Sequence, residues 1–236
     1  MKIVVITDDN LKKELFAQGL NESAKIEWSH DIENISKNAT ACVDLLFDTD
    51  REKRKELLIK IAADTVIVND VTGLTENLPA NFIRINGWPT FLKRGITEAS
   101  CNNEAVKEKA EKVFSFFNKK IEWVPDIHGF ITPRVICTII NEAYFSLEDN
   151  VSSREEIDIA MRTGTNYPMG PFEWASRIGV GKVLQLLQKM NEENGRYNIA
   201  PALISCNGTT FRSFVVVANV DSSNRSSTMS QVDRHE

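Results

Sequence analysis

Two carboxylates, Asp8 and Asp9, follow the apolar run Lys2–Thr7 and precede a stretch with helical spacing. A carboxylate in this position can cap the helix and interact with the positive end of its dipole. It also repels a phosphate at the same terminus: at ~5 Å and an effective dielectric of about 40, each pair costs roughly 1.5–2 kcal/mol. The turn is therefore expected to form a capped helix start and a poor phosphate site.

The other side chains with distinctive chemistry are few and scattered. His30 follows a predicted strand and could approach a nucleotide ribose, although a solvated loop position is the competing interpretation. Neither a CxxC pair nor a metal-ligand spacing occurs, which predicts reduced thiols and no metal site. The cysteines concerned are Cys42, Cys101, Cys137 and Cys206.

Composition narrows the class of protein. The chain has 236 residues and a net charge of −5, so it is not a polybasic binder of nucleic acid. Hydrophobic residues make up 42% and charged residues 26%, which is typical of a globular protein with an ample core. No apolar run approaches the ~20 residues that span a bilayer, and the first ten residues do not resemble a secretory signal. We expect a soluble, cytoplasmic protein without a nucleic-acid or membrane partner.

The first half of the chain alternates between strand and helix patterns. Helical spacing is found in Asn10–Leu20, in residues 50–63 and in Glu104–Asn118. Short β-branched runs predict strands at Lys2–Thr7, Lys25–Ser29, Ala41–Phe47, Thr65–Asn69, Phe82–Ile85 and Ile121–Val124. This alternation predicts a parallel, doubly wound sheet over residues 1–125.

The second half predicts helix after helix. Pro133–Glu148 has the spacing of a largely buried helix, and Ser153 with Glu156 forms a capping box before the next one, which should end at Gly164. Gly181–Glu193 is amphipathic, with Gly195 as its expected stop. We therefore expect an all-α domain over 126–203, followed by a polar, disordered tail over 204–236. Within that tail, the apolar run Phe214–Val220 could pair with another strand.

Four stretches of the helical half are more specific than helical spacing alone: GFITPR, NEAYFSLED, EEIDIAMRTGTNYPMGPFEW and IGVGKVLQLL. With them, the chain closely resembles the C-terminal domain of the 3-hydroxyacyl-CoA dehydrogenase family, and the PMGPF string at Pro168–Phe172 is the most specific part. Val66–Leu74 and Arg84–Ser100 resemble the family's N-terminal site segments more weakly. The resemblance covers about residues 1–203 and implies a shortened, Rossmann-like NAD-binding-type domain before the helices.

The resemblance implies an activity as well as a fold. In that family, a 3-hydroxyacyl-CoA is oxidised to a 3-ketoacyl-CoA with NAD as the hydride acceptor. A histidine takes the hydroxyl proton, a glutamate orients the histidine, and a serine and an asparagine hold the substrate oxygen. The helical domain forms a homodimer.

Residue by residue, most of these positions differ in this chain. The general-base position falls on Asn86, twelve residues before Glu98, which is the one position retained outright. Thr72 matches the serine, and Pro133 replaces the asparagine. An amide cannot act as a general base, and losing such a base typically costs about 10²–10⁴ in rate. The family's Gly-rich turn is replaced by residues 7–10, which contain no glycine, so NAD binding is expected to be poor.

Three hypotheses follow. The first is a family member with weak or no dehydrogenase activity that binds an acyl-CoA-like ligand. The second is an active NAD-dependent enzyme rebuilt around His128, as a substitute base, with Thr72 and Glu98. The third is a structural dimerisation module with an empty cleft. Trp88 could fill the emptied site or simply pack in the core, and the basic run Arg51–Lys60 could attract a CoA phosphate or form a solvated helix face.

Overall fold

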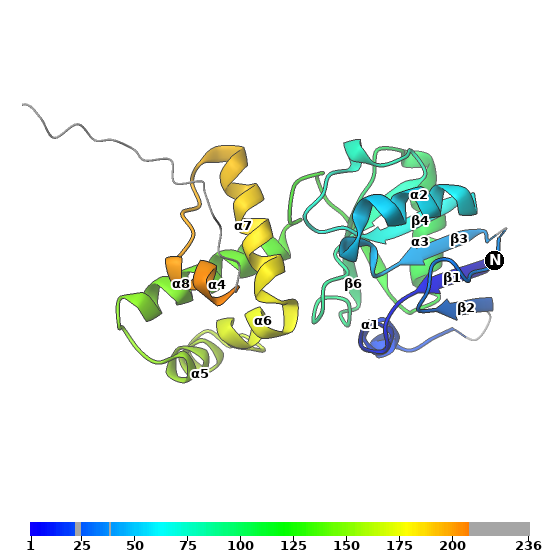
Figure 1. Cartoon of the computed structure of the whole chain (residues 1–236). Helices are drawn as coiled ribbons and strands as arrows, with labels where there is room; N and C mark the ends of the chain where they lie inside the picture. The colour runs from blue at the N-terminus through cyan, green and yellow to red at the C-terminus, as the bar shows by residue number, and fades with distance from the viewer. Residues whose placement is uncertain (22–24, 38, 208–236) are drawn as a thin grey trace, which may run out of the picture.

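The computed structural model describes residues 1–21, 25–37 and 39–207, which form a sheet part followed by a helical part (Figure 1). The predictions for Phe214–Val220 and for most of the tail lie outside the described residues. None of the helices within these three ranges is long and apolar enough to cross a bilayer.

The described residues of the first half form a seven-stranded sheet with the order β2-β1-β3-β4-β5-β6-β7. Its strands are β1 (Lys2–Ile6), β2 (Lys25–Ser29), β3 (Ala41–Asp44), β4 (Thr65–Asn69), β5 (Phe82–Ile85), β6 (Ile96–Ser100) and β7 (Lys120–Trp123). The first five strands are mutually parallel, as predicted. The sequence did not predict β6, which pairs antiparallel with β5 and parallel with β7. Its five residues, ITEAS, lack a β-branched apolar run, and no helix separates it from β5.

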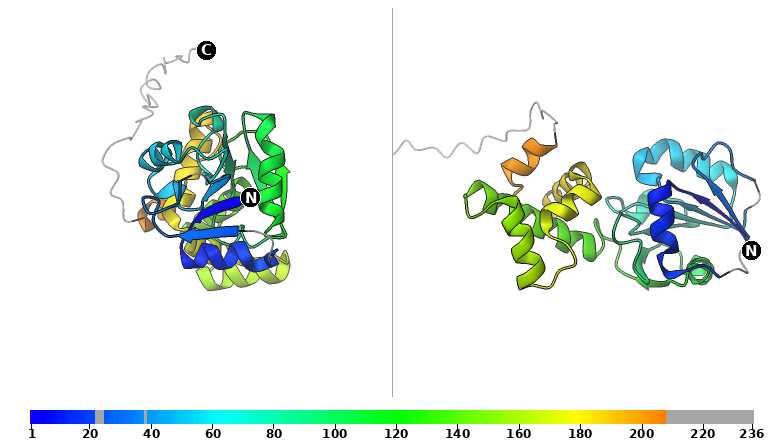
Figure 2. Two further views of the ribbon diagram at one scale, coloured as in Figure 1. Left: turned by 90° about the vertical axis from the view of Figure 1, so that its right-hand side faces the viewer. Right: turned by 90° about the horizontal axis from the view of Figure 1, so that it is seen from below.

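Three helices cover the two faces of the sheet (Figure 2). In β1, Ile3 and Val5 point to the face covered by α1 (Asp9–Leu15) and α3 (Lys107–Ser115). Val4 and Ile6 point to the opposite face, under α2 (Arg51–Ile61). The alternation follows from the two-residue period of a strand and explains why β1 is apolar throughout.

α1 and α3 are shorter than predicted, because single 3₁₀ turns take up one end of each. The turn Phe16–Gln18 follows α1, and Gly19 then stops the helix with a φ of 89°. The turn Glu104–Val106 precedes α3.

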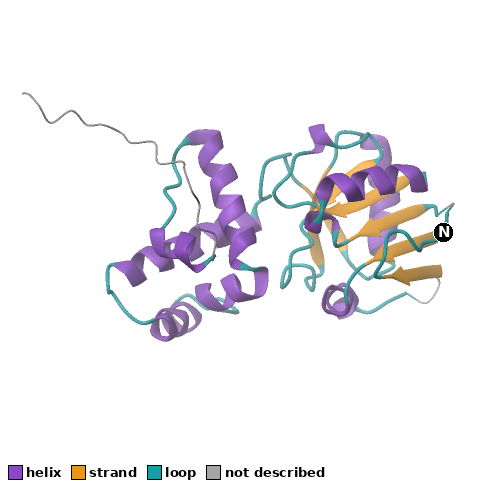
Figure 3. Ribbon diagram, in the orientation of Figure 1, coloured by secondary structure: helices purple, strands orange, loops and turns teal. Residues whose placement is uncertain are grey.

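The second half is entirely helical (Figure 3). It contains α4 (Thr132–Glu148), α5 (Arg154–Gly164), α6 (Pro171–Ile178), α7 (Val180–Asn194) and α8 (Pro201–Cys206). The capping box of Ser153 and Glu156 is present, and Gly195 ends α7 in the left-handed conformation, so both predictions are confirmed. The sequence did not predict the short helices α6 and α8. α8 runs three residues beyond the expected domain boundary at residue 203.

The two parts share a hydrophobic core. Val71, Trp88 and Phe91, from loops at the end of the sheet, belong to the same buried cluster as the side chains of α4, α6 and α7. Trp88 is thus part of the core, which agrees with the packing interpretation. The buried guanidinium of Arg84 pairs with Asp126 in the connecting segment, and Asp126 Oδ2 also accepts a hydrogen bond from the Thr75 amide at 2.8 Å. The junction is therefore tied to the sheet by charge as well as by apolar contact.

Candidate functional site

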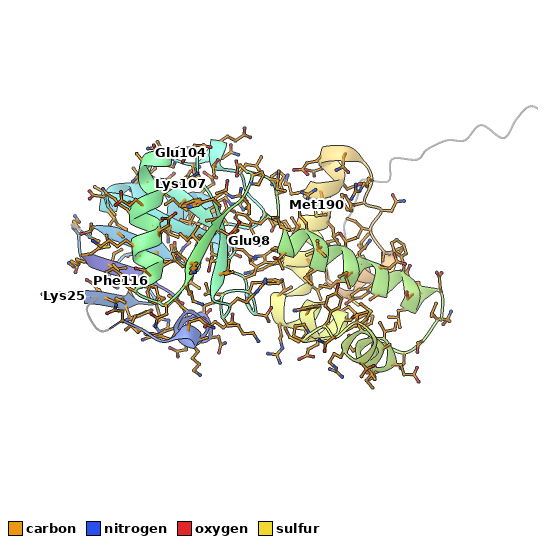
Figure 4. The ribbon with its side chains drawn as sticks, turned by 180° about the vertical axis from the view of Figure 1, so that it is seen from behind. Lys25, Glu98, Glu104, Lys107, Phe116 and Met190 are labelled. Atoms are coloured by element: carbon orange, nitrogen blue, oxygen red, sulfur yellow. The ribbon has the colours of Figure 1, made fainter. Side chains whose placement is uncertain are left out.

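The structure brings Asn86 and Glu98 together. Figure 4 shows Glu98 in the sheet part, toward the helical part. Asn86 follows β5 and Glu98 lies on β6, and the Asn86 backbone amide donates to the Glu98 carbonyl at 3.0 Å. Their side chains also meet, since Asn86 Nδ2 donates to Glu98 Oε2 at 3.0 Å. The other carboxylate oxygen accepts hydrogen bonds from the amide and the hydroxyl of Thr132, both at 2.9 Å. Glu98 therefore connects β5, β6 and the first residue of α4.

In this arrangement Asn86 can position a neighbouring group but cannot itself accept a proton. The Asn86 amide group has no usable proton affinity near neutral pH, and its nitrogen already donates to Glu98. Asn86 Oδ1 is buried and has no hydrogen-bond partner among the described residues. Both oxygens of Glu98 are engaged as acceptors. The pair is consequently a structural link between the two parts of the chain at the place where acid–base chemistry was considered.

Thr72, after β4, lies in a separate polar cluster. Its hydroxyl accepts a hydrogen bond at 3.0 Å from Arg51 Nη2, which also pairs with the buried Asp70. Burial raises the pKa of Asp70, and the charge of Arg51 opposes that shift. On the next turn of α2, Arg54 forms a two-pronged pair with the buried Asp44, at 2.7 Å for both contacts. The first two arginines of the predicted basic run thus fold onto the strand ends instead of forming a solvated face.

His128 approaches Thr72 but neither Asn86 nor Glu98. Its Nδ1 lies 2.9 Å from the Thr72 carbonyl oxygen. Because a carbonyl only accepts, Nδ1 must hold the proton, which leaves Nε2 as the basic nitrogen. That nitrogen faces Glu193, 3.9 Å from Oε1. In the part of the chain that the structure describes, no hydrogen bond or ion pair joins His128 to the Asn86–Glu98 pair.

A crevice of about 470 Å³ opens beside the ends of β1 and β3, where the strand order reverses direction. Asp8 caps α1 here, as predicted: its Oδ1 accepts hydrogen bonds from the amides of Asn10 and Leu11, both at 2.8 Å. Asp48 pairs across the crevice with Lys182 of α7 at 2.6 Å. Glu14 also lines the crevice, and both of its carboxylate oxygens lie 2.8 Å from the Thr90 amide. The crevice is therefore lined by carboxylates with partners inside the protein.

A second cavity, of about 400 Å³, lies between the loop at residues 90–94 and the helical part. Thr132 lines this cavity and also binds Glu98, so the cavity adjoins the Asn86–Glu98 pair.

The remaining sequence candidates do not form a site. His30 is exposed and lies 3.6 Å from Asp9, at the solvated position that was the competing interpretation. Among residues 1–21, 25–37 and 39–207, no three His, Cys, Asp or Glu side chains are grouped so that they could hold a metal ion.

Comparisons with known proteins agree on one family. Residues 129–206 match the family model described as 3-hydroxyacyl-CoA dehydrogenase, C-terminal domain. The chain is 28% identical over 171 residues to the 3-hydroxyadipyl-CoA dehydrogenase of Escherichia coli strain K12, covering 72% of this chain and 32% of that protein. It is also 28% identical over 219 residues to the 3-hydroxybutyryl-CoA dehydrogenase of Bradyrhizobium diazoefficiens, covering 83% of this chain and 73% of that protein.

Residues 129–206 thus match the C-terminal domain of the 3-hydroxyacyl-CoA dehydrogenase family, and the chain as a whole is similar to dehydrogenases of that family. It spans about a third of the length of the first relative and about three quarters of the second. Its fold matches the crystal structure of (S)-3-hydroxybutyryl-CoA dehydrogenase from Ralstonia eutropha with a TM-score of 0.68, at 15% identity. That match covers 86% of this chain and 92% of the other, and it supports the predicted order of a Rossmann-like domain followed by a helical domain.

The crevice beside β1 and β3 does not fit the pyrophosphate of NAD. In a doubly wound fold, the pyrophosphate lies at the N-terminus of the first helix and binds its free amides. Two of those amides already bind Asp8, and residues 7–10 contain no glycine that would let a phosphate approach the backbone. Glu14 adds a further negative charge, whereas Asp48 is neutralised by its ion pair with Lys182. We therefore derive no chemical step through this cofactor.

Sequence reasoning missed two residues that take part in these contacts, Thr132 and Arg51. Thr132 was not singled out, although a threonine before a proline is a signal of a helix start, and here it is the residue that binds Glu98. The contact of Arg51 with Asp70 and Thr72 had no local signal. Pro133 stands in the first turn of α4, where a missing amide hydrogen costs nothing, and it offers no side-chain hydrogen bond to a ligand.

Proposed function

We propose that this protein binds an acyl-CoA-like thioester beside the Asn86–Glu98 pair and has weak or no NAD-linked dehydrogenase activity. The Asn86–Glu98 hydrogen bond is the main observation behind this proposal, because an amide donates where the family's reaction needs a proton acceptor. The capped terminus of α1 supports the same conclusion from the cofactor side.

Two observations support retained ligand binding. The relatives named above are dehydrogenases of 3-hydroxyadipyl-CoA and 3-hydroxybutyryl-CoA. This similarity supports an acyl-CoA as the class of ligand. The cavity next to Thr132, at about 400 Å³, falls within the range of about 300–1,000 Å³ that is usual for small-molecule sites. A purely structural dimerisation module, the third hypothesis, would have no need of such a cavity.

Ligand titration tests the proposal directly. Calorimetry with acetoacetyl-CoA should give a measurable dissociation constant, whereas millimolar NAD should give neither heat nor a shift in thermal unfolding. A mixture of NAD and 3-hydroxybutyryl-CoA should form no NADH above the rate without protein. Turnover at ordinary enzymatic rates, of about 1 s⁻¹ or more, would overturn the proposal.

The variant Asn86→His distinguishes the effect of the missing general base from the effect of the missing phosphate site. The substitution places a proton acceptor next to Glu98 again, but the crevice remains without a phosphate cradle, so we expect no NAD-dependent oxidation. Asn86→Ala is the matched control for loss of the amide. If Asn86→His restored activity, the crevice would bind NAD after all, and only the missing base would explain the difference.

An active enzyme with a substitute base is the second candidate, and one observation favours it. The hydrogen bond from His128 Nδ1 to the Thr72 carbonyl selects the neutral tautomer in which Nε2 is the acceptor, as a general base requires. His128→Gln tests this candidate in any preparation that shows turnover. A loss of about 10²–10⁴ in rate would support it, and unchanged turnover would exclude it.

A further inference from the structure

The cavity beside Thr132 has apolar walls. One side comes from the loop that follows Asn86, and the other comes from α4 and the segment between α5 and α6. Apolar and aromatic side chains dominate its lining, through Phe91, Ile136, Tyr167, Pro168, Met169 and Trp174. Such a lining favours a hydrocarbon chain over a polar group.

Two cations, Lys93 and Arg94, also line this cavity, and no carboxylate does. Both side chains are exposed, and within the described residues neither forms an ion pair. Arg94 only approaches the Thr132 hydroxyl, at 3.5 Å. Long basic side chains can lie along an apolar wall while their charges stay at the edge. The cavity therefore combines an apolar interior with an unpaired positive charge.

The backbone that presents these two cations is held in place. Lys119, only 3% exposed, donates hydrogen bonds from Nζ to the carbonyls of Leu92 at 2.5 Å and Arg94 at 2.7 Å. Gln18 Nε2 donates to the carbonyl of Lys93 at 3.0 Å. Three successive carbonyls are thus anchored by side chains from elsewhere in the sheet part. A fixed backbone lowers the entropic cost of pairing the cations with an anion.

We propose that this cavity takes an acyl chain that ends in a carboxylate, with Lys93 and Arg94 binding the terminal anion. The inference rests on the proposed function, because the thioester end of the same ligand lies beside Asn86 and Glu98. From there the chain passes Thr132 and lies along the apolar wall. The positive edge then favours a terminal carboxylate over a terminal methyl group.

The phosphates of coenzyme A are a different source of negative charge. They belong to a large and polar nucleotide, which the apolar lining and the volume of about 400 Å³ do not suit. We therefore assign the anion to the acyl end, and the experiment includes free coenzyme A to separate the two sources.

The decisive measurement compares adipyl-CoA with hexanoyl-CoA, whose acyl chains have the same number of carbons and differ in the terminal group. We expect adipyl-CoA to bind about tenfold more tightly, and the ratio should fall as salt screens the exposed charges. In the double variant Lys93→Gln/Arg94→Gln, the two dissociation constants should agree within about twofold, with hexanoyl-CoA binding unchanged. The double variant Lys112→Gln/Lys120→Gln removes the same charge at exposed positions outside the cavity and should keep the preference.

The possible results separate the inference from the proposed function. Equal affinity for both thioesters in the unaltered protein would overturn the inference and leave the proposed function intact. Binding of neither thioester would overturn the proposed function itself. If the Lys93→Gln/Arg94→Gln variant also bound free coenzyme A more weakly, the cations would contact its phosphates, and the inference would be wrong. Thermal unfolding and the swapped variant Lys93→Arg/Arg94→Lys, which should keep the preference, exclude a folding defect.

Discussion

At the scale of single residues, the side chains of Asp8 and Asn86 use hydrogen-bonding groups that the dehydrogenase reaction would need for its cofactor and its general base. The Asp8 carboxylate binds the amides at the start of α1, and the Asn86 amide donates to Glu98. Asp8 satisfies two amides at the start of α1, whereas Asn86 gains one hydrogen bond and leaves its Oδ1 buried without a partner among the described residues. The contacts are incompatible with a pyrophosphate at α1 and with proton abstraction at Asn86.

Lys119 provides a prediction about pH. Burial lowers the pKa of Lys119 to about 8, from an ordinary value of 10.5, while the charge of Glu14 acts in the opposite direction. Between these two values the unfolded chain binds more protons than the folded protein, so stability attributable to this group rises with pH. Relative to a Lys119→Met variant, the unaltered protein should gain about 3 kcal/mol of unfolding free energy between pH 7.5 and pH 10.5.

Urea unfolding at several pH values would measure this gain. Lys112→Met, at an exposed site of α3, serves as the control and should show no such pH-dependent difference. A difference between the unaltered protein and Lys119→Met that stayed constant with pH would contradict the prediction.

At the scale of elements, the family-specific PMGPF string has a structural reason. Asp158 of α5 caps α6 from outside: its carboxylate accepts hydrogen bonds from the amides of Phe172 at 2.8 Å and Glu173 at 3.1 Å. Gly170 is the N-cap residue of α6, and a Cβ atom there would overlap with this carboxylate. The glycine and the aspartate, twelve positions apart, are therefore parts of one contact between two helices.

Gly170→Ala should destabilise the helical part by about 3 kcal/mol, because the added methyl group displaces the Asp158 cap and overpacks the turn. Gly164→Ala makes the same chemical change at the last residue of α5, where no atom lies within 4 Å of the added Cβ. It should be neutral or stabilise by up to about 1 kcal/mol. Calorimetric unfolding of both variants would decide, and similar stabilities for the two would contradict this account of the turn.

At the scale of the whole molecule, we propose a homodimer formed through the helical part. α5 has amphipathic spacing but no buried side chain, and Ile159 on it is 52% exposed. Val151, just before α5, is 70% exposed. α5 therefore exposes apolar surface together with the preceding Val151, and exposed apolar surface of this kind is typical of a protein–protein interface.

Ile159→Glu should raise the dimer dissociation constant at least tenfold, because it places a charge in an apolar contact. Ile96→Glu is the matched control: Ile96 is 54% exposed on β6, in the sheet part, and its substitution should leave the dimer unchanged. Sedimentation velocity at several concentrations measures both. An unaltered protein that sediments as a monomer at every concentration would contradict the proposal.

Much of this organisation could be predicted from local pattern. β2, β4 and β5 have the predicted boundaries, and β1, β3 and β7 differ from the predicted runs by a few residues at one or both ends. These predictions succeeded because the alternation of buried side chains and the caps of helices depend on residues close together in the chain. The pairing of Asn86 with Glu98 was likewise expected from their spacing, once the family's pattern was aligned with this sequence.

The sequence alone predicted most of the strands, the longer helices, and a resemblance to the 3-hydroxyacyl-CoA dehydrogenase family in which Asn86 and a turn without glycine stand at the base and phosphate positions. The tertiary structure decided the rest: the antiparallel β6, the Glu98–Thr132 link, the contact of Arg51 with Asp70, and the cavity edged by Lys93 and Arg94. The physical reason is how far apart in the sequence the contacting residues lie. Caps and periodic burial join residues within a turn or two, whereas these contacts join side chains that only the packing of the sheet against the helices brings together.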